Sequence, residues 1–370
     1  MKKFLLLLAM LFCVAFFVVG CSDKKSTTIN GVVAVDQAKG ATVYLIDYNT
    51  GSVVDSTTIV DSTFIFAGDY GEETLLGIRT SFNYGGMCVA EKGTIYINLV
   101  TDSLSGTPLN DKMGLFVRQM HKIDDSQQQH MADLTAKRQT LNEKDTAAIR
   151  AISEEYDSML ADLEGQYLSK LQALYDENKD NILGAYAFME MIGQYQSAAQ
   201  LEEALKNAAP VVRNFQPIQQ ALERLRNISA TAVNMHYADV KGLSYPNHDA
   251  ILLSELIDGK VALVDFWASW CGPCRQEIKD NLIRIYEQYK NQGLQVVGLD
   301  ISDKFDKHDA AVKELGITYP QLIDTTDVAA RTYGIEGIPE IILIDKEGTI
   351  VARKLRGDNI EAAVKELLAK

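Results

Sequence analysis

Two cysteines separated by two residues, Cys271 and Cys274, are the side chains of this sequence with the clearest capacity for chemistry. Thiols at this spacing can close a disulfide with each other, so the pair can store two electrons and pass them on without a metal or a bound cofactor. An apolar, strand-like stretch (residues 261–268) ends just before the first cysteine, and a helix-compatible stretch (residues 275–289) begins just after the second. The pattern therefore places Cys271 at a helix N-terminus, where unpaired N–H groups stabilise a thiolate.

A CxxC pair could instead be half of a structural zinc site. Such a site needs four ligands and usually takes the other two from a second cysteine or histidine pair. The sequence contains no second CxxC, and its five histidines form no pair at zinc-ligand spacing. We therefore expect a redox pair, with no metal and no other cofactor.

The N-terminus predicts export from the cytoplasm. A short basic start, Met1-Lys2-Lys3, is followed by an uninterrupted apolar run from Phe4 to Gly20, after which the composition turns abruptly polar. This order is typical of a signal peptide, which would comprise residues 1–20 and is excluded from fold reasoning. An uncleaved membrane anchor is the alternative.

Residues 18–21, Val-Val-Gly-Cys, resemble the lipobox of bacterial lipoproteins. The resemblance implies cleavage after Gly20 and acylation of Cys21, with residues 21–26 as a linker. Each buried CH₂ of an acyl chain contributes about 0.8 kcal/mol, so several chains would anchor the protein to a membrane. An ordinary cleaved secretory signal would leave the protein without this anchor.

Length and charge narrow the remaining possibilities. The 370 residues are too many for one ordinary domain and predict two or three. The formal charge is −14 and the sequence contains no basic cluster, which argues against nucleic-acid binding. Beyond Cys21 only Cys88, Cys271 and Cys274 carry thiols, too few for a disulfide framework. The isolated Cys88 is interpreted as a small buried hydrophobic residue.

Residues 27–107 are predicted to form a small β-sandwich-like domain. Short runs rich in β-branched and aromatic residues alternate there with Gly, Asp and Asn, which are strand and turn signals. We see no catalytic constellation in this region. The predicted strands are Gly31–Val35, Thr42–Ile46, Ser52–Val54, Ser56–Val60, Thr63–Phe66 and Thr94–Val100.

Residues 108–233 are predicted to be mostly helical, because no proline falls between positions 109 and 209 and glycine is sparse there. One apolar stripe recurs at spacings of three or four residues and indicates a long amphipathic helix. We expect its apolar face to pack on neighbouring helices, with a docking or dimerisation seam as the alternative. The stripe comprises Ile149, Ile152, Tyr156, Met159, Leu163, Tyr167, Leu171 and Leu174.

Residues 234–370 alternate between strand-like and helix-like segments and end in a hairpin and a helix. This pattern predicts an α/β domain whose sheet is covered on both faces. Strands are expected at 260–268, 294–301, 320–323, 340–345 and 349–354, and helices at 271–290, 308–316, 328–333 and 359–370.

This last region resembles the thioredoxin-fold domain of exported, membrane-tethered thiol–disulfide oxidoreductases of the ResA/TlpA type. The resemblance is carried by residues 265–275 (DFWASWCGPCR), Glu277, residues 333–339 (YGIEGIP) and the hairpin at 343–348. It covers a little over a third of the chain and implies a thioredoxin fold. Residues 27–107 look, more weakly, like a β-rich domain of unknown function that precedes such domains in some bacterial lipoproteins.

The resemblance implies a role for each reacting residue. Cys271 would be the exposed attacking thiolate that forms a mixed disulfide with a partner, and Cys274 would be the more buried thiol that resolves it. Asp265 would be a buried carboxylate that relays a proton to or from Cys274. Glu277 matches an acidic residue found near the site in the membrane-tethered branch.

Further residues would contact the partner. Pro339 would be a cis-proline whose loop, with Ile338 before it, faces the disulfide and binds the partner's backbone, and Trp270 would pack beside the cysteines. Gly272 and Pro273, between the cysteines, resemble those of reducing thioredoxins.

The sequence departs from the family pattern at two positions. Lys279 stands where a helix-kinking proline is common, so the helix is expected to keep its full hydrogen-bond ladder and to run straighter. Glu340 stands where threonine commonly follows the cis-proline. Neither change removes a reacting group.

Together these features predict an enzyme that exchanges its dithiol with thiol- or disulfide-containing proteins of the cell envelope, as a reductant supplied by a membrane electron donor. It would be lipid-anchored at Cys21 and face the periplasm. A thiol peroxidase of the same fold is one alternative, although Val264 and Ala268 occupy the positions where a peroxidase would carry proline and threonine. An envelope binding protein with a redox-sensitive domain is another.

Overall fold

The computed structural model describes residues 26–142, 144–301 and 303–370. The predicted signal peptide and Cys21 lie outside these residues. No helix in the described ranges is both long and apolar enough to cross a membrane. The chain divides into two compact units, residues 1–159 and residues 160–370, which are described here one at a time.

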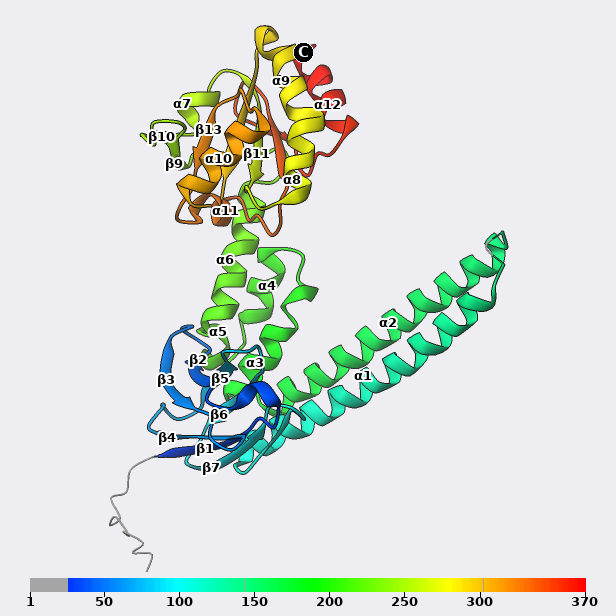
Figure 1. Ribbon diagram of the computed structural model, residues 1–370, viewed down its shortest axis with the longest axis vertical. Helices are drawn as coiled ribbons and strands as arrows, with labels where there is room; N and C mark the ends of the chain where they lie inside the picture. Colours follow the sequence, from blue (N-terminus) through cyan, green and yellow to red (C-terminus); the bar gives the residue numbers. More distant parts are fainter. Residues whose placement is uncertain (1–25, 143, 302) are drawn as a thin grey trace, which may run out of the picture. The chain divides into compact units, whose positions relative to one another are not determined.

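The first unit contains two four-stranded sheets, coloured from blue to cyan in Figure 1. One sheet has the order β4-β1-β7-β8 and the other β3-β2-β5-β6. Strand β1 pairs antiparallel with β4 and parallel with β7. The strands are β1 (Thr27–Val32), β2 (Thr42–Asp47), β3 (Val53–Thr58), β4 (Thr63–Gly68), β5 (Thr74–Thr80), β6 (Gly85–Ala90), β7 (Gly93–Asn98) and β8 (Ser103–Ser105), with a short 3₁₀ turn at Asp36–Ala38.

The β-rich region expected from the sequence is present, but several strand assignments were wrong. Gly31–Val35 covers only the end of β1, and the two strands expected at 52–54 and 56–60 form the single strand β3. Strands β5 and β6 were missed because they contain glycines, which weaken a strand signal. Gly31 shows why glycine is required inside β1: an added Cβ would lie 1.9 Å from the ring of Phe64.

Helix α1 (Pro108–Thr140) begins the helical part of the chain and α2 (Thr146–Glu177) follows it. The apolar stripe predicted from the sequence falls within α2. Of its residues, Met159, Leu171 and Leu174 are buried, whereas the side chain of Tyr156 is 36% exposed.

The second unit continues from α2 with short helices, for which the sequence provides caps. The side chain of Asn181 accepts a hydrogen bond from the N–H of Leu183 at the start of α3, and Ser197 accepts one from Gln200 at the start of α4. The helices are α3 (Ile182–Glu190), α4 (Ala198–Leu205), α5 (Pro210–Arg213) and α6 (Gln216–Ala230), with a 3₁₀ turn at Ile192–Gln194.

A seven-stranded sheet of order β10-β9-β13-β12-β11-β14-β15 completes the second unit. Its central strand β11 runs parallel to β12 and antiparallel to β14. The strands are β9 (Lys241–Ser244), β10 (Ala250–Leu252), β11 (Val261–Trp267), β12 (Leu294–Asp300), β13 (Gln321–Ile323), β14 (Glu340–Ile344) and β15 (Ile350–Ala352). The helices are α7 (Ser254–Ile257), α8 (Gly272–Glu277), α9 (Ile283–Tyr289), α10 (Phe305–Leu315), α11 (Val328–Thr332) and α12 (Asp358–Leu368), with a 3₁₀ turn at Lys290–Gln292.

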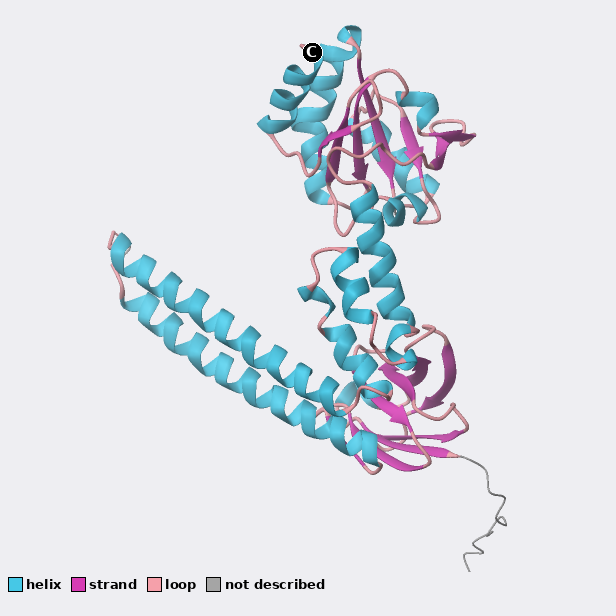
Figure 2. Cartoon of the chain, turned by 180° about the vertical axis from the view of Figure 1, so that it is seen from behind, coloured by secondary structure: helices cyan, strands magenta, loops and turns pink. Residues whose placement is uncertain are grey.

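Helices cover both faces of this sheet, as Figure 2 shows. Every residue of β11 is buried, and alternate residues enter two different cores. Leu263 packs in the core that includes α9 and α12, and Phe266 packs in the core that includes α7 and α11. This is the thioredoxin-like α/β arrangement expected from the sequence, and it fixes the end of β11 from which the CxxC segment emerges.

The helix after the cysteines is not the straight helix expected from the absence of proline at Lys279. A π-helical turn, Ile278–Leu282, separates α8 from α9, and the N–H of Ile283 bonds the carbonyl of Ile278. Cys274, Ile278 and Leu282 are all fully buried at steps of four residues. Residues four apart lie on one face of a helix, so these three side chains form a continuous buried face that runs through the π turn.

Candidate functional site

The two cysteines form a disulfide at the N-terminus of α8, with their Cα atoms 5.3 Å apart. Cys271 is the N-cap residue, and its sulfur accepts a hydrogen bond of 3.2 Å from the N–H of Cys274. Pro273 occupies the first turn, where a missing N–H costs nothing. A sulfur held in this position receives the positive end of the helix, which favours its anionic form after reduction.

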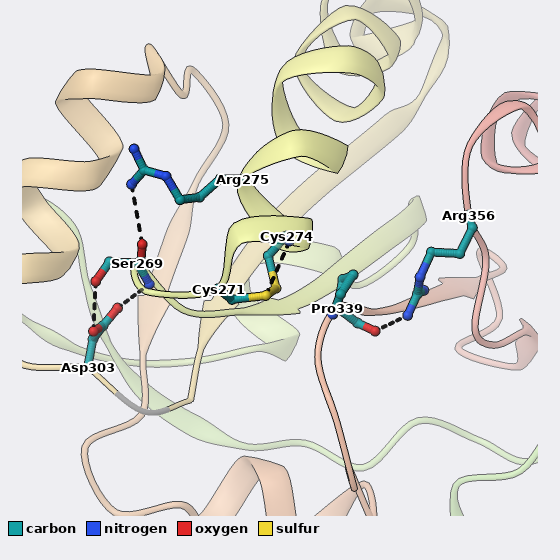
Figure 3. The surroundings of a disulfide bond; sticks show 7 residues. All are labelled: Ser269, Cys271, Cys274, Arg275, Asp303, Pro339 and Arg356. Atoms are coloured by element: carbon teal, nitrogen blue, oxygen red, sulfur yellow. Dashed lines mark hydrogen bonds between the residues drawn. A yellow bond between two sulfur atoms is a disulfide. The ribbon is translucent and has the colours of Figure 1, made fainter. Parts of the chain in front are cut away.

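The loop that leads into Cys271 is fixed through Ser269 (Figure 3). The carboxylate of Asp303 accepts hydrogen bonds from the N–H of Ser269 and from its hydroxyl, the latter at 2.9 Å. The guanidinium of Arg275 donates to the carbonyl of Ser269 at 3.3 Å and to Glu314 at 2.6 Å. The backbone N–H and the backbone carbonyl of Ser269 are thereby both held, so the approach to Cys271 is fixed by Asp303 and Arg275.

The peptide bond between Ile338 and Pro339 is cis, which is what the resemblance implies for this position. Ile338 packs against the core cluster that contains both cysteines. Arg356 donates a hydrogen bond to the carbonyl of Pro339 (Figure 3). The cis-proline loop is therefore supported from the segment that follows β15.

Asp265 lies in β11 and is 1% exposed. Neither of its carboxyl oxygens has a hydrogen-bond partner among the described residues. Burial, reinforced by the charge of Glu277, raises the pKa of Asp265 to about 8, and the charge of Arg356 opposes this rise. A carboxyl group with such a pKa can either hold or release a proton near neutrality, as a proton relay requires.

Glu277 is half-buried in the last turn of α8 and is held by two donors. Its Oε1 accepts hydrogen bonds from the side chain of Asn281 at 2.6 Å and from the N–H of Gly357 at 3.0 Å. Glu277 thus connects the active-site helix to the segment that also carries Arg356. Glu277 also acts on the site electrostatically, because its negative charge raises the pKa of Asp265.

Glu340, the second departure from the family pattern, has a structural partner. Its carboxylate is 7% exposed and accepts a hydrogen bond from Arg353 at 3.1 Å. Arg353 also donates to the carbonyl of Thr231, just after α6, and to the carbonyl of Tyr333. A threonine at position 340 could not neutralise this arginine. Arg353 at its position therefore depends on the carboxylate of Glu340.

One of the predicted positions differs from expectation. In this disulfide form Cys271 is only 5% exposed, although it remains the more accessible cysteine because Cys274 is fully buried. Trp270, the residue before Cys271, is 65% exposed. Gly272 and Pro273 are exposed beside the cysteines.

Three residues at the site were not singled out from the sequence: Asp303, Arg353 and Arg356. Asp303 lies just beyond the end of β12. Polar residues that follow the carboxyl ends of parallel strands often reach a functional site, so its position in the sequence could have indicated it. The two arginines follow β15 and had no such signal. No cluster of metal-ligating side chains occurs in the described part of the chain.

Comparison with known proteins agrees with this geometry. Residues 237–353 match the model of the AhpC/TSA family, and residues 27–113 match a domain of unknown function, DUF4369. The chain is 27% identical over 148 residues to the thiol-disulfide oxidoreductase ResA of Bacillus thuringiensis subsp. konkukian, covering 40% of this chain and 80% of that one. It is 36% identical over 120 residues to the thiol:disulfide interchange protein HelX of Rhodobacter capsulatus, covering 31% and 65%.

Among solved structures, the chain is similar to the thioredoxin domain of a thiol-disulfide oxidoreductase from Bacteroides vulgatus. The identity is 30%, the match covers 37% of this chain and 98% of that one, and the TM-score is 0.35. The family match and the named relatives fall on the segment that carries the CxxC pair and the cis-proline. The C-terminal part of this chain is therefore similar to the thioredoxin-like proteins of the AhpC/TSA family, and the named relatives that align with it are thiol–disulfide oxidoreductases.

Proposed function

We propose that Cys271 and Cys274 exchange their dithiol with disulfides of client proteins on the periplasmic side of a membrane, and that the protein acts as the reductant. The observation that supports this most directly is the placement of Cys271 at the N-terminus of α8, with its sulfur accepting the N–H of Cys274. A thiolate is the nucleophile of disulfide exchange, and this position favours it.

The exchange takes two steps in the reducing direction. The thiolate of Cys271 attacks one sulfur of the client disulfide, which forms a mixed disulfide and releases the first client sulfur as a thiolate that takes up a proton. Cys274 then loses its proton and attacks the sulfur of Cys271, which releases the second client thiolate. The client gains two electrons and two protons, and the Cys271–Cys274 disulfide described above is the product.

Asp265 is proposed to take the proton that Cys274 loses. It is the carboxyl group of β11 that is fully buried and unpartnered among the described side chains. Its pKa of about 8 gives it a proton affinity close to that of a thiol, so transfer between the two groups is nearly balanced. Glu277 and Arg356 adjust this affinity in opposite directions.

The direction of transfer rests on the two residues between the cysteines. Gly272 and Pro273 resemble the corresponding residues of reducing thioredoxins, which have potentials of about −270 mV, whereas a strong oxidant lies near −120 mV. Equilibration of the full chain with glutathione buffers measures the potential. A value near the strong-oxidant end would reverse the proposed direction.

The periplasmic location and lipid anchor rest on the N-terminal sequence. Acylation at Cys21 after cleavage behind Gly20 would place the described units outside the cytoplasm, where a membrane electron donor would have to restore the dithiol. Mass spectrometry of the mature N-terminus tests this. An unmodified Cys21, or an intact leader, would contradict it.

A trapping experiment tests the proposed order of the thiols. Cys274→Ser keeps the attacking sulfur but removes the resolving one, so mixed disulfides with clients should accumulate on Cys271 and disappear on addition of dithiothreitol. Cys88→Ser is the matched control, because Cys88 is fully buried in β6, away from the CxxC segment in the chain. Trapping by Cys271→Ser instead of by Cys274→Ser would show that the roles are exchanged.

A further inference from the structure

A surface hollow of about 450 Å³ lies beside the cis-proline loop. Residues 334–340 of this loop form one side of it, and Arg353, Lys354 and Arg356 after β15 contribute a second. The third side comes from Ile228 at the end of α6 and from Ala232 and Val233 just beyond it. The size falls within the range of about 300–1,000 Å³ that is usual for ligand sites.

The wall contributed by α6 is held against the thioredoxin-like domain by specific contacts. The side chain of Asn227 donates to the carbonyl of Arg331 at 3.0 Å, and Arg353 donates to the carbonyl of Thr231 at 3.0 Å. Gly334, with a φ of 59°, approaches Ile228 so closely that an added Cβ would lie 2.3 Å from its Cγ1. The hollow is therefore formed by fixed elements before any client arrives.

The charges that line the hollow are unequal. Both of its carboxylates are paired, Glu340 with Arg353 and Glu336 with Arg224. By contrast, neither Lys354 nor Arg356 forms an ion pair within the part of the chain that the structure describes, and Arg356 donates only to the backbone carbonyls of Leu355 and Pro339. Two cations thus remain available in a protein whose formal charge is −14.

The remaining lining is aliphatic. Val233 is 44% exposed, and Ile335 and Ile338 are partly buried. Because Ile338 and Pro339 also belong to the loop beside the cysteines, the hollow begins at the site of disulfide exchange. Residues of an extended chain are about 3.3 Å apart, so a client joined to Cys271 would place residues close in sequence to its own cysteine within the hollow.

We infer that this hollow is the client-recognition site, and that it selects extended segments that carry an aspartate or glutamate and an aliphatic side chain close to the reacting cysteine. The inference rests on the proposed disulfide exchange and assigns the substrate class for it. The carboxylate would meet Lys354 and Arg356, and the aliphatic side chain would lie against Val233. Helix α6, from outside the thioredoxin-like domain, would thereby contribute to specificity.

The test uses the reduced full chain and three short peptides that differ only near a single cysteine, where they carry aspartate, asparagine or lysine next to a leucine. Each cysteine is blocked as a neutral mixed disulfide with 2-mercaptoethanol. We expect kcat/KM to be about fivefold higher for the aspartate peptide than for the asparagine peptide, and this preference should fall as salt is added. Equal rates for all three peptides would overturn the inference.

Lys354→Glu should abolish the preference for the aspartate peptide and favour the lysine peptide. The substitution keeps an unbranched side chain at a position with φ of 57°, so the backbone requirement is unchanged. Lys346→Glu, in the turn between β14 and β15 and outside the hollow, is the charge-matched control and should leave the preference intact. If the control shifts the preference as much as Lys354→Glu does, the hollow is not the determinant.

Val233→Asp tests the part played by the end of α6. It places a carboxylate in the hollow, so the rate with the aspartate peptide should fall about fivefold. If the rate is unaltered, the α6 wall takes no part in recognition.

Hydroxyethyl disulfide, which is small and uncharged, separates this inference from the proposed exchange itself. Lys346→Glu, which lies outside the hollow, should reduce it at the rate of the unaltered protein. A protein that reduces hydroxyethyl disulfide but shows no charge preference contradicts the recognition site alone. A protein that reduces neither hydroxyethyl disulfide nor the peptides contradicts the proposed function.

Discussion

Strand β11 and helix α2 both carry long apolar patterns, but the apolar residues are buried to different extents. All seven residues of β11 are buried. In α2 only three of the striped residues are buried, and Tyr156 and Leu160 are each 36% exposed. The strand is packed on both faces by a core, whereas much of the helix surface meets water. Burial rather than apolar pattern therefore decides where a substitution will be felt.

The two regions also differ in how they hold charge. Around β11, Asp265 is buried without a partner among the described groups, and Glu340 is buried with a dedicated one. In the helical region, Lys137 and Glu155 form a 2.6 Å ion pair whose side chains are 54% and 40% exposed. The four substitutions below test this contrast and are given from the largest expected effect to the smallest.

Asp265→Asn should produce the largest change, in the pH dependence of stability. The pKa of Asp265 rises from 3.8 to about 8 on folding. Between these values the folded state keeps a proton that the unfolded state has lost, so stability falls as pH rises from about 4 to about 8. The loss is on the order of 5 kcal/mol, and the variant should not show it. Urea unfolding at a series of pH values measures the difference.

Cys88→Ser is a suitable comparison for that series, because it changes a buried side chain of β6 without altering a group that titrates below pH 8. A slope that is identical in Asp265→Asn and the unaltered protein would show that the carboxyl group is not kept protonated by burial.

Glu340→Thr restores the residue common in the family and should destabilise the second unit by about 4 kcal/mol, because it leaves Arg353 buried without its partner. Adding Arg353→Met should recover most of the loss, since replacing both members of a buried pair is often neutral. Thermal unfolding of the three variants measures this. If Glu340→Thr alone costs nothing, the pair does not hold the end of α6.

Asp303→Ala should cost about 2 kcal/mol, because both of its hydrogen bonds to Ser269 are lost. The rate of reaction of reduced Cys271 with iodoacetamide should change as well, since the loop before it is no longer fixed. Ser269→Ala removes only the hydroxyl contact and should cost about half as much. Equal effects of the two substitutions would mean that the backbone contact of Asp303 contributes little.

Lys137→Ala, in α1, should have the smallest effect. Exposed ion pairs lose most of their Coulomb energy to solvent and to side-chain entropy, so we expect no measurable change in the midpoint of thermal unfolding. A loss comparable to that of Glu340→Thr would remove the contrast between the two regions.

The sequence indicates the candidate reacting residues better than it indicates the residues that hold them in place. Cys271 and Cys274 could be located because a CxxC motif between a strand and a helix imposes local geometry. Asp265 and Pro339 could be placed only through the resemblance to thioredoxin-fold oxidoreductases. Asp303, Arg353 and Arg356 could not, because their contacts join segments far apart in the chain, and a single sequence carries no local record of such contacts.

The errors in local structure have different origins. The turn Ile278–Leu282 is π-helical although it contains no residue that breaks helices, so no local signal predicts it. Strands β5 and β6 contain glycines that weaken the strand pattern, and pairing with neighbouring strands compensates. In these strands tertiary pairing outweighs the intrinsic preference of the segment.

Cys88 has a practical consequence for following this molecule in solution. It is fully buried in β6, and burial raises the pKa of its thiol to about 12. A maleimide added to the reduced, folded chain should therefore modify Cys271, the more accessible sulfur of the CxxC segment, and leave Cys88 untouched. Cys88 would be labelled only when the first unit unfolds. The rate of its labelling therefore measures unfolding of the first unit, independently of the reacting cysteines.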